Sequence, residues 1–305
     1  MKHFILIIFS LTSFISYAQE IPIAKIYYVF KHINDTTQRD KFLQDDVKTL
    51  LGQYSSYYTT ASQEKMEAAI NQQMSNASFD GNLVISRSGT AIRSSYIIDN
   101  QKNKIDHIYK IAGADYLLDE KMPELDWEIL EDTKEIGGYT CQKAVANFKG
   151  RVYEAWFTTE IPMPFGPWKL QGLPGLILAA ADTKNEVIFE YAGFEKTEGN
   201  SAVRIDIPVN AKRVTQEEVN KLDKAFKENP SAFMSAQSGG SSRVVPSGNS
   251  GNSTATVMVV GRNSGSADRA PAPQLDASKI KSVNIKNDEG YKPSRVTNNP
   301  IELIP

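Results

Sequence analysis

The stretch that decides the fold is residues 151–178, RVYEAWFTTEIPMPFGPWKLQGLPGLIL. It holds two of the chain's three tryptophans, Trp156 and Trp168, together with four prolines and three glycines. Proline fixes the backbone angle φ, whereas glycine permits positive φ and the close approach of another backbone segment. We therefore expect one tight loop, packed around aromatic side chains, between a strand that ends near Thr158 and a strand that begins near Leu176.

Short runs of β-branched and aromatic residues surround this loop on both sides. Such runs are typical of strands, and they lie at 23–33, 92–98, 104–111, 125–130, 142–148, 151–158, 176–181, 186–194 and 202–209. The last run is the most regular, because alternate residues from Val203 to Val209 are apolar. Short turn signals such as Lys149-Gly150 favour antiparallel neighbours, and no strand–helix–strand rhythm repeats along the chain.

Two amphipathic helices are expected beside these strands. At 62–77, apolar residues recur every three or four positions after a capping box of Thr60 and Gln63. A second helix starts with the capping box that begins at Thr215 and ends before Pro230. The pattern predicts a mainly β (α+β) fold, a curved antiparallel sheet or half-open barrel with both helices packed against it.

The first eighteen residues are typical of a cleavable secretory signal. Lys2 and His3 precede an apolar run that is too short to cross a bilayer permanently, and small residues at the end of the run predict cleavage after Ala18. No later segment reaches membrane-spanning length. The single cysteine, Cys141, excludes an internal disulfide and a lipid anchor at the cleavage site. We expect a periplasmic or secreted protein of a Gram-negative envelope.

Composition divides the remaining chain into three parts. Residues 19–234 should form the curved β domain. Residues 235–278 are rich in glycine, serine, asparagine and proline, and they predict a flexible insertion, because they hold too little apolar surface to offset the entropy of ordering. Residues 279–305 should return to the same domain with a strand near 280–285 and a tail.

The net charge of the chain limits the kinds of partner that it would attract. Lysine and arginine number 34 and aspartate and glutamate number 36, for a net charge of −2. This balance gives no long-range attraction to polyanions, so nucleic acid and anionic membrane surfaces are excluded as expected partners. Neutral, apolar or peptide-like ligands fit better.

The loop also carries a resemblance to a known family. The string at 172–177 and the blocks around it resemble the GLPGLI family of exported bacterial proteins, and they cover most of the chain after residue 18. The motif residues are Trp127, Tyr139, Cys141, Gly166, Pro167, Gly172, Leu173, Pro174, Gly175, Leu176 and Ile177. The family has no agreed activity, and the segment 235–278 does not map onto it.

The resemblance implies a fold and, from the fold, a class of function. A curved antiparallel sheet crossed by a helix is similar to the half-open barrels of periplasmic lipoprotein carriers. It is similar, more weakly, to the bowl-shaped amino-terminal domain of one class of bacterial peptide N-glycosidase. Both comparisons concern the fold, which does not fix function, and together they favour binding over catalysis.

No sequence motif points to catalysis, a metal or a cofactor. His32 and His107 lie in separate predicted strands without metal-ligand spacing, and each is expected to be an ordinary strand residue. Cys141 is expected to be buried and inert, because no helix start or cationic cluster lies beside it. Adjacent carboxylates such as Glu131 and Asp132 point to opposite faces of a strand, so they form no acid/base pair.

Two interpretations of the loop remain open. It is either a structural corner or the mouth of a concave face, at which Trp156, Trp168 and Lys169 would contact a ligand. The favoured function is a non-enzymatic exported binding or carrier protein that holds a hydrophobic, peptide or lipid-like ligand in the concave sheet. The alternatives are a hydrolase or hydrolase-associated, glycopeptide-directed module, or a structural partner of an outer-membrane protein complex, tethered by 235–278.

Overall fold

The computed structural model describes residues 20–87, 92–197, 203–237, 280–287, 294 and 296–304. The signal expected at 1–18 lies outside the described residues. The same is true of the insertion expected at 235–278, except for residues 235–237, which end a helix.

A twelve-stranded curved sheet dominates the fold, in the order β13-β7-β6-β5-β3-β2-β1-β12-β11-β10-β9-β8. All neighbours are antiparallel except β13 and β7. The strands are β1 (Ala24–His32), β2 (Leu43–Leu51), β3 (Ser55–Thr60), β5 (Ser94–Asp99), β6 (Lys104–Ile111), β7 (Ala114–Lys121), β8 (Glu128–Ile136), β9 (Tyr139–Phe148), β10 (Arg151–Thr158), β11 (Leu176–Asp182), β12 (Val187–Lys196) and β13 (Lys212–Arg213). The end strands do not pair with each other, so the barrel stays open, and the expected mainly β fold is confirmed.

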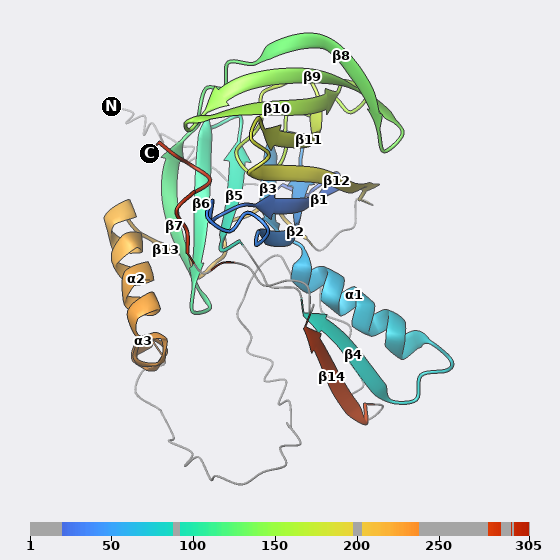
Figure 1. Cartoon of the computed structure of the whole chain (residues 1–305), viewed down its shortest axis with the longest axis vertical. Helices are drawn as coiled ribbons and strands as arrows, with labels where there is room; N and C mark the ends of the chain where they lie inside the picture. The colour runs from blue at the N-terminus through green and yellow to red at the C-terminus, as the bar shows by residue number, and fades with distance from the viewer. Residues whose placement is uncertain are drawn as a thin grey trace, which may run out of the picture.

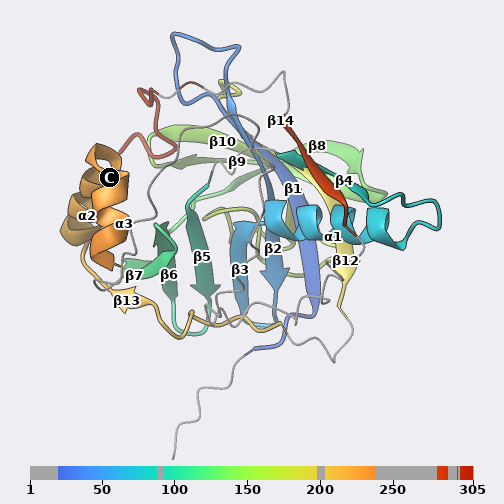
Figure 2. The same cartoon turned by 90° about the horizontal axis from the view of Figure 1, so that it is seen from below.

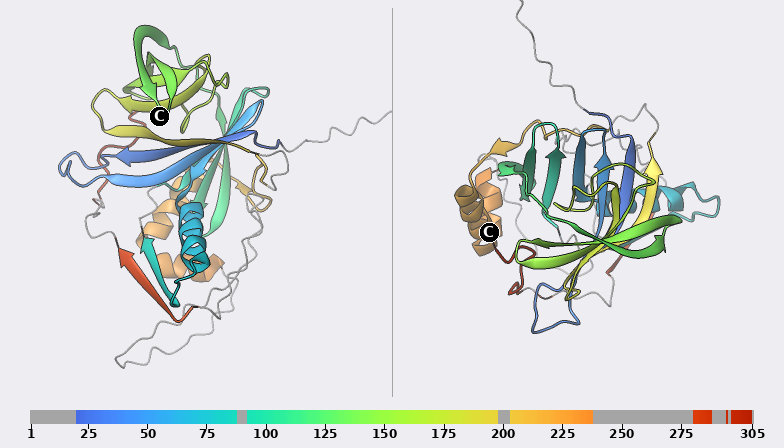
Figure 3. Two further views of the ribbon diagram at one scale, coloured as in Figure 1. Left: turned by 90° about the vertical axis from the view of Figure 1, so that its right-hand side faces the viewer. Right: turned by 90° about the horizontal axis from the view of Figure 1, so that it is seen from above.

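The curvature gives the sheet an inner and an outer face (Figure 1). The inner face carries the larger core, which includes Tyr28, Phe30, Tyr58, Tyr96 and Tyr153. The outer face buries a smaller cluster that includes Leu50, Tyr57, Ile97, Ile108 and Leu117. In the view from above, the sheet curls round the loop between β10 and β11 (Figure 3, right).

The described residues form three helices where two were expected. α1 (Ser62–Ser75) packs on β4 (Asn82–Arg87), which pairs in parallel with β14 (Ser282–Asn287) in a separate two-stranded sheet. α2 (Gln216–Glu228) lies beside β6, and α3 (Pro230–Gln237) follows it directly (Figures 1 and 2). No helix in the described ranges is long and apolar enough to cross a membrane.

The two predicted capping boxes have opposite outcomes. The box at Thr215 is confirmed, because its side chain accepts from the backbone of Glu218 and the Glu218 side chain accepts in return. The box at Thr60 is wrong, since Ala61 is the N-cap of α1 and no side chain caps it. Thr60 still belongs to β3, and its hydroxyl donates to Asp45 instead, at 3.1 Å.

The third helix shows that Pro230 starts a helix rather than marking only the end of α2. Proline is tolerated in the first turn of a helix because its missing N–H would have no partner there. The Asn229 side chain accepts a hydrogen bond from the backbone N–H of Ala232 at 3.0 Å and so caps the new helix.

The strand expected at 202–209 is wrong, although its alternation was the most regular in the chain. Its described part forms one isolated bridge, between Ile205 and Glu20. Ile205, with Val203 and Ile207 beside it, packs against the cluster on the outer face of the sheet. The alternation of apolar and polar residues therefore reflects burial of one side of this segment, and the segment does not pair with a neighbouring strand along its length.

The loop from 159 to 175, which we call the corner, closes the inner face. β10 ends at Thr158 and β11 begins at Leu176, as expected. Thr49 of β2 donates to the Gly166 carbonyl oxygen at 3.1 Å, so the corner reaches across the interior. At Gly175, an added Cβ would lie only 2.1 Å from the Thr158 carbonyl oxygen. Glycine is therefore required there by close backbone contact.

We expect Gly175→Ala to lower the free energy of unfolding by about 3 kcal/mol, because the clash is with backbone and cannot be relieved by a rotamer change. Gly138→Ala is the matched control. It has a positive φ of 84° but open space at the Cβ position, so it should cost only about 1 kcal/mol. Urea unfolding of both variants measures the difference, and equal costs would contradict the role of close contact.

A buried guanidinium attaches the C-terminal tail to this sheet. Arg151 of β10 donates to Asp182 at 2.6 Å and to Glu186 at 3.1 Å. Its remaining N–H groups donate to Ile301 O, Asn299 Oδ1 and Pro300 O at 2.9, 2.6 and 2.7 Å. Among the described residues β14 pairs with β4 and not with the large sheet, so it is the tail after β14 that returns to the large sheet.

Replacing Arg151 should be among the most destabilising changes in the chain. Arg151→Met leaves buried Asp182 without its cation and leaves Glu186 with only the half-exposed Arg39, 2.8 Å away. We expect a loss of about 3–5 kcal/mol in the free energy of unfolding. Lys31→Met removes the half-exposed Lys31–Glu190 pair, 2.9 Å apart, and should cost at most about 1 kcal/mol. Denaturant titration of both variants tests this, and a small loss at Arg151 would refute it.

Candidate ligand-binding site

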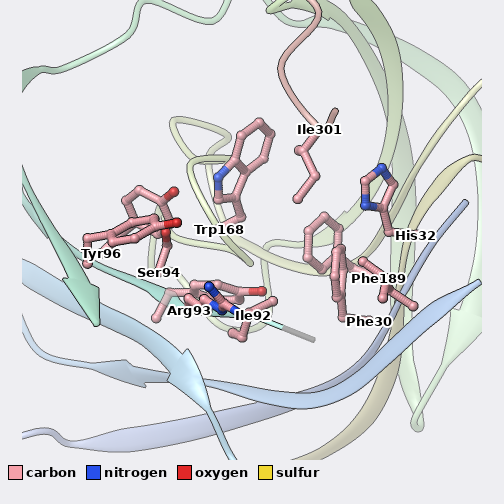
Figure 4. A pocket seen from close by; sticks show the side chains of 12 residues that line it. Phe30, His32, Ile92, Arg93, Ser94, Tyr96, Trp168, Phe189 and Ile301 are labelled. Carbon is pink, nitrogen blue, oxygen red and sulfur yellow. The ribbon is translucent and has the colours of Figure 1, made fainter. Parts of the chain in front are cut away.

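A pocket of about 230 Å³ opens on the inner face (Figure 4). Six of its lining residues are aromatic: Phe30, Tyr58, Tyr96, Tyr109, Trp168 and Phe189. They come from strands far apart in the sequence and from the corner. Figure 4 shows Trp168 and Ile301 at the top of the pocket, with Tyr96 on one side and the Phe30–Phe189 pair on the other.

The aromatic wall is held by ring-to-ring packing. Phe30 and Phe189 lie 5.1 Å apart between centroids, and Tyr58 meets Phe189 edge to face at 6.4 Å. These distances are in the range that stabilises aromatic pairs. Ring contacts therefore fix the positions of these side chains relative to one another.

Polar groups stand at the edge of this wall. Arg93 and Ser94 line the pocket beside Tyr109. Arg93 lies 3.5 Å from Asp223 of α2, and Tyr109 donates to the same carboxylate at 3.4 Å. The rim is thus attached to α2 and combines aromatic surface with a half-exposed cation.

The three residues proposed from sequence as ligand contacts separate in the structure. Trp168 lines the pocket, and it holds a left-handed backbone with φ of 55°, which is uncommon for a bulky residue. Lys169 is buried behind the pocket. Trp156 points to the outer face, where Lys134 sits 4.0 Å above its ring and Lys143 lies 6.0 Å away.

Lys169 is occupied by internal partners. Its ammonium lies 2.6 Å from both Glu120 and Glu302 and 5.1 Å above the Tyr96 ring. Burial alone would lower its pKa, but Tyr96 and these carboxylates raise the pKa above its usual value. It is therefore a buried cation that orders the corner, rather than a free group for an anionic ligand.

Motif residues outside the corner contribute a hydrogen bond to it and a buried side chain to the core. Trp127 donates its indole N–H to the Gln171 carbonyl oxygen at 2.8 Å. Cys141 is fully buried near the backbone of Tyr139, and burial raises the pKa of its thiol to about 11. A thiol that remains protonated at neutral pH is a poor nucleophile, so the structure gives Cys141 a packing role.

One cluster was missed by sequence reasoning. Ser94, His107 and Glu120 come from β5, β6 and β7 and meet on the inner face. Ser94 Oγ lies 2.9 Å from His107 Nε2, and Glu120 Oε1 lies 2.7 Å from His107 Nδ1. The pairings Tyr96–His107 and His107–Leu118 set the register that brings them together. The only local signal was a polar residue at an inward position in each strand.

The described part of the chain contains no group of three or more histidine, cysteine, aspartate or glutamate side chains placed to hold an ion. The site is thus an aromatic pocket with polar groups at its edge, on the inner face of an open, curved β domain.

Comparison with known proteins assigns this domain to a family. The profile of the N-glycanase peptide, N-terminal domain, matches residues 58–214, and the chain belongs to that family. No curated protein matches the chain.

Two solved structures are similar to part of this chain, "Structure of PNGF-II in C2 space group" and "Structure of PNGF-II in P21 space group". Their TM-scores are 0.46 and 0.45, and their sequence identities are 13% and 14%. Each match covers 67% of this chain but only 32% and 33% of the other. This chain therefore corresponds to about a third of the length of those proteins.

The pocket wall should make stability depend on pH through His32. His32 Nε2 donates to the Asn299 carbonyl oxygen at 2.7 Å. Burial, with a smaller contribution from the charge of Arg151, lowers the pKa of His32 from 6.5 to about 4. The unfolded chain therefore takes up this proton first, and we expect about 3 kcal/mol of stability to be lost as pH falls from 6.5 to 4.

His32→Gln isolates this contribution, because an amide can still donate to Asn299 but does not titrate in this range. The free energy of unfolding, measured in urea at pH 7.5 and pH 4, should differ less between the two pH values in the variant than in the unchanged chain. Equal pH dependence in both proteins would show that His32 is not responsible.

Proposed function

We propose that this chain is a glycopeptide-directed module that works with a hydrolase, and that its inner-face pocket holds a sugar ring of an N-linked glycopeptide. The family supports the direction of this proposal, since its name refers to N-glycanase. The export expected from residues 1–18 and the resemblance to the GLPGLI family suit a protein that meets glycopeptides outside the cytoplasm.

The observation that carries the proposal is the combination of rings and polar groups in one small pocket. A sugar ring has apolar C–H faces and a rim of hydroxyl groups. Aromatic side chains such as Tyr96, Tyr109 and Trp168 offer flat apolar surfaces, while Arg93 and Ser94 can hydrogen-bond to hydroxyls. The pocket therefore matches both surfaces of a sugar.

The size of the pocket favours this ligand over a lipid. Its volume of about 230 Å³ is below the range of roughly 300–1,000 Å³ that encloses a drug-sized molecule. The corner fills the space that a carrier of an acyl chain would need. A single ring at the end of a larger, solvent-exposed molecule fits the available space.

Calorimetric titration with an N-linked glycopeptide tests the proposal. Tyr109→Ala should weaken binding about tenfold, equivalent to ~1.4 kcal/mol, because the rim loses its ring. Tyr109→Phe keeps the ring but removes the hydrogen bond to Asp223, and it should bind nearly as well as the unchanged chain. Trp156→Ala, on the outer face, should have no effect.

Two further titrations serve as controls and define the results that would contradict the proposal. The same peptide without its glycan and a long-chain fatty acid should both fail to bind. If the fatty acid binds more tightly than the glycopeptide, or if Tyr109→Ala binds the glycopeptide unchanged, the proposal is wrong.

A further inference from the structure

We propose that Ser94, His107 and Glu120 form a nucleophile–base–carboxylate triad that removes a short ester-linked acyl group from the molecule held in the inner-face pocket. This inference rests on the proposed function for the identity of that molecule. The triad gives the module an acyl-ester hydrolase activity of its own, separate from cleavage of the bond between glycan and peptide.

The geometry has the order that such a triad requires. Ser94 lines the pocket. His107 lies behind it with Nε2 at 2.9 Å from Ser94 Oγ, and Glu120 lies on the far side of the imidazole at 2.7 Å from Nδ1. A nucleophile within hydrogen-bonding distance of a base, which is itself oriented by a third group, is the recurring arrangement of covalent hydrolases.

The ionisation of Glu120 selects the useful tautomer. Burial would raise the pKa of Glu120, but the hydrogen bond from His107 and the charge of Lys169 together lower it to about 2. An ionised carboxylate only accepts hydrogen bonds, so Nδ1 of His107 carries the proton. In the neutral ring, Nε2 is then the acceptor for the Ser94 hydroxyl.

Neighbouring contacts fix the orientation of the base and the carboxylate. The His107 ring stacks on Tyr96 at 4.5 Å with an interplanar angle of 26°. The second oxygen of Glu120 lies 2.6 Å from the Lys169 ammonium. Catalytic groups whose positions are set by packing and by further hydrogen bonds lose little freedom when substrate binds. The corner, which supplies Lys169, therefore supports the triad as well as the pocket.

The reaction balances without any other reagent. Ser94 Oγ attacks the ester carbonyl carbon and passes its proton to His107 Nε2. The carbon–oxygen bond to the alcohol breaks, and the alcohol oxygen takes that proton. Water then attacks the acyl group on Ser94, gives a proton to Nε2, and releases the acid as Ser94 regains its hydrogen. Arg93, which also lines the pocket, is the cation that this wall offers to the developing oxyanion.

A biotinylated alkyl fluorophosphonate tests for an activated serine. We expect one covalent adduct on the intact folded chain by mass spectrometry, mapped to Ser94 by peptide analysis and absent in Ser94→Ala. His107→Asn should slow labelling at least about 100-fold. Ser95→Ala is the matched control, because Ser95 is adjacent but bonds to Thr59 at 2.9 Å on the outer face, and it should label normally.

Glu120 acts through His107 and is tested as a positioning residue. Glu120→Gln should slow labelling, and Glu120→Asp, which restores the carboxylate, should regain part of the rate. A purely structural role predicts the opposite order, because glutamine keeps the shape of glutamate. Circular dichroism of each variant identifies any that fail to fold. Ser94→Ala removes a single oxygen atom, so it is the variant expected to disturb folding least.

Two results overturn the triad: a folded, unchanged chain that takes up no probe, or an adduct that persists at the same rate in Ser94→Ala. Parallel titration with the glycopeptide keeps the two proposals apart. Binding without labelling refutes the triad alone, whereas labelling at Ser94 without glycopeptide binding supports the triad and refutes the proposed function.

Discussion

The structure depends on one buried cation, the guanidinium of Arg151. Its five N–H groups are all used, on Asp182, Glu186 and three groups of the C-terminal tail. A buried charge is tolerated only when its hydrogen bonds are complete, so β10, the turn after β11 and the tail must come together. That assembly also places Asn299 against His32 and brings Ile301 into the pocket wall.

The corner determines what the curved sheet can hold. An open barrel of this kind could enclose a large apolar cavity, but the prolines and glycines of 159–175 fold a compact aromatic segment into the interior. Phe165, Leu170 and Leu173 are almost completely buried there. A small aromatic pocket remains beside Trp168, and Lys169 of the same loop pairs with Glu120 beneath it. The corner thus leaves a carrier-like shape with a pocket of about 230 Å³ on its inner face.

The pocket and the proposed triad place different requirements on the inner face of the sheet. Aromatic residues fill a curved inner face for reasons of packing alone, and the proposed sugar ring would contact rings that are already in place. Ser94, His107 and Glu120 instead place three polar groups in hydrogen-bonding sequence within an apolar core. Such groups cost free energy to bury unless they hydrogen-bond to one another. Here the series of hydrogen bonds and ion pairs that begins at Ser94 continues through His107 and Glu120 to Lys169 and Glu302.

The sequence alone determined where β10 ends and β11 begins around the corner, the capped start of α2 and the burial of Cys141. The reason is that φ preferences, capping side chains and apolar content act within a few residues. Tertiary structure alone decided which face Trp156 and Trp168 occupy, that Val203 to Ile207 pack without joining the sheet, and that Ser94, His107 and Glu120 meet. Those outcomes depend on strand register, and register is set by contacts between residues that are distant in the chain.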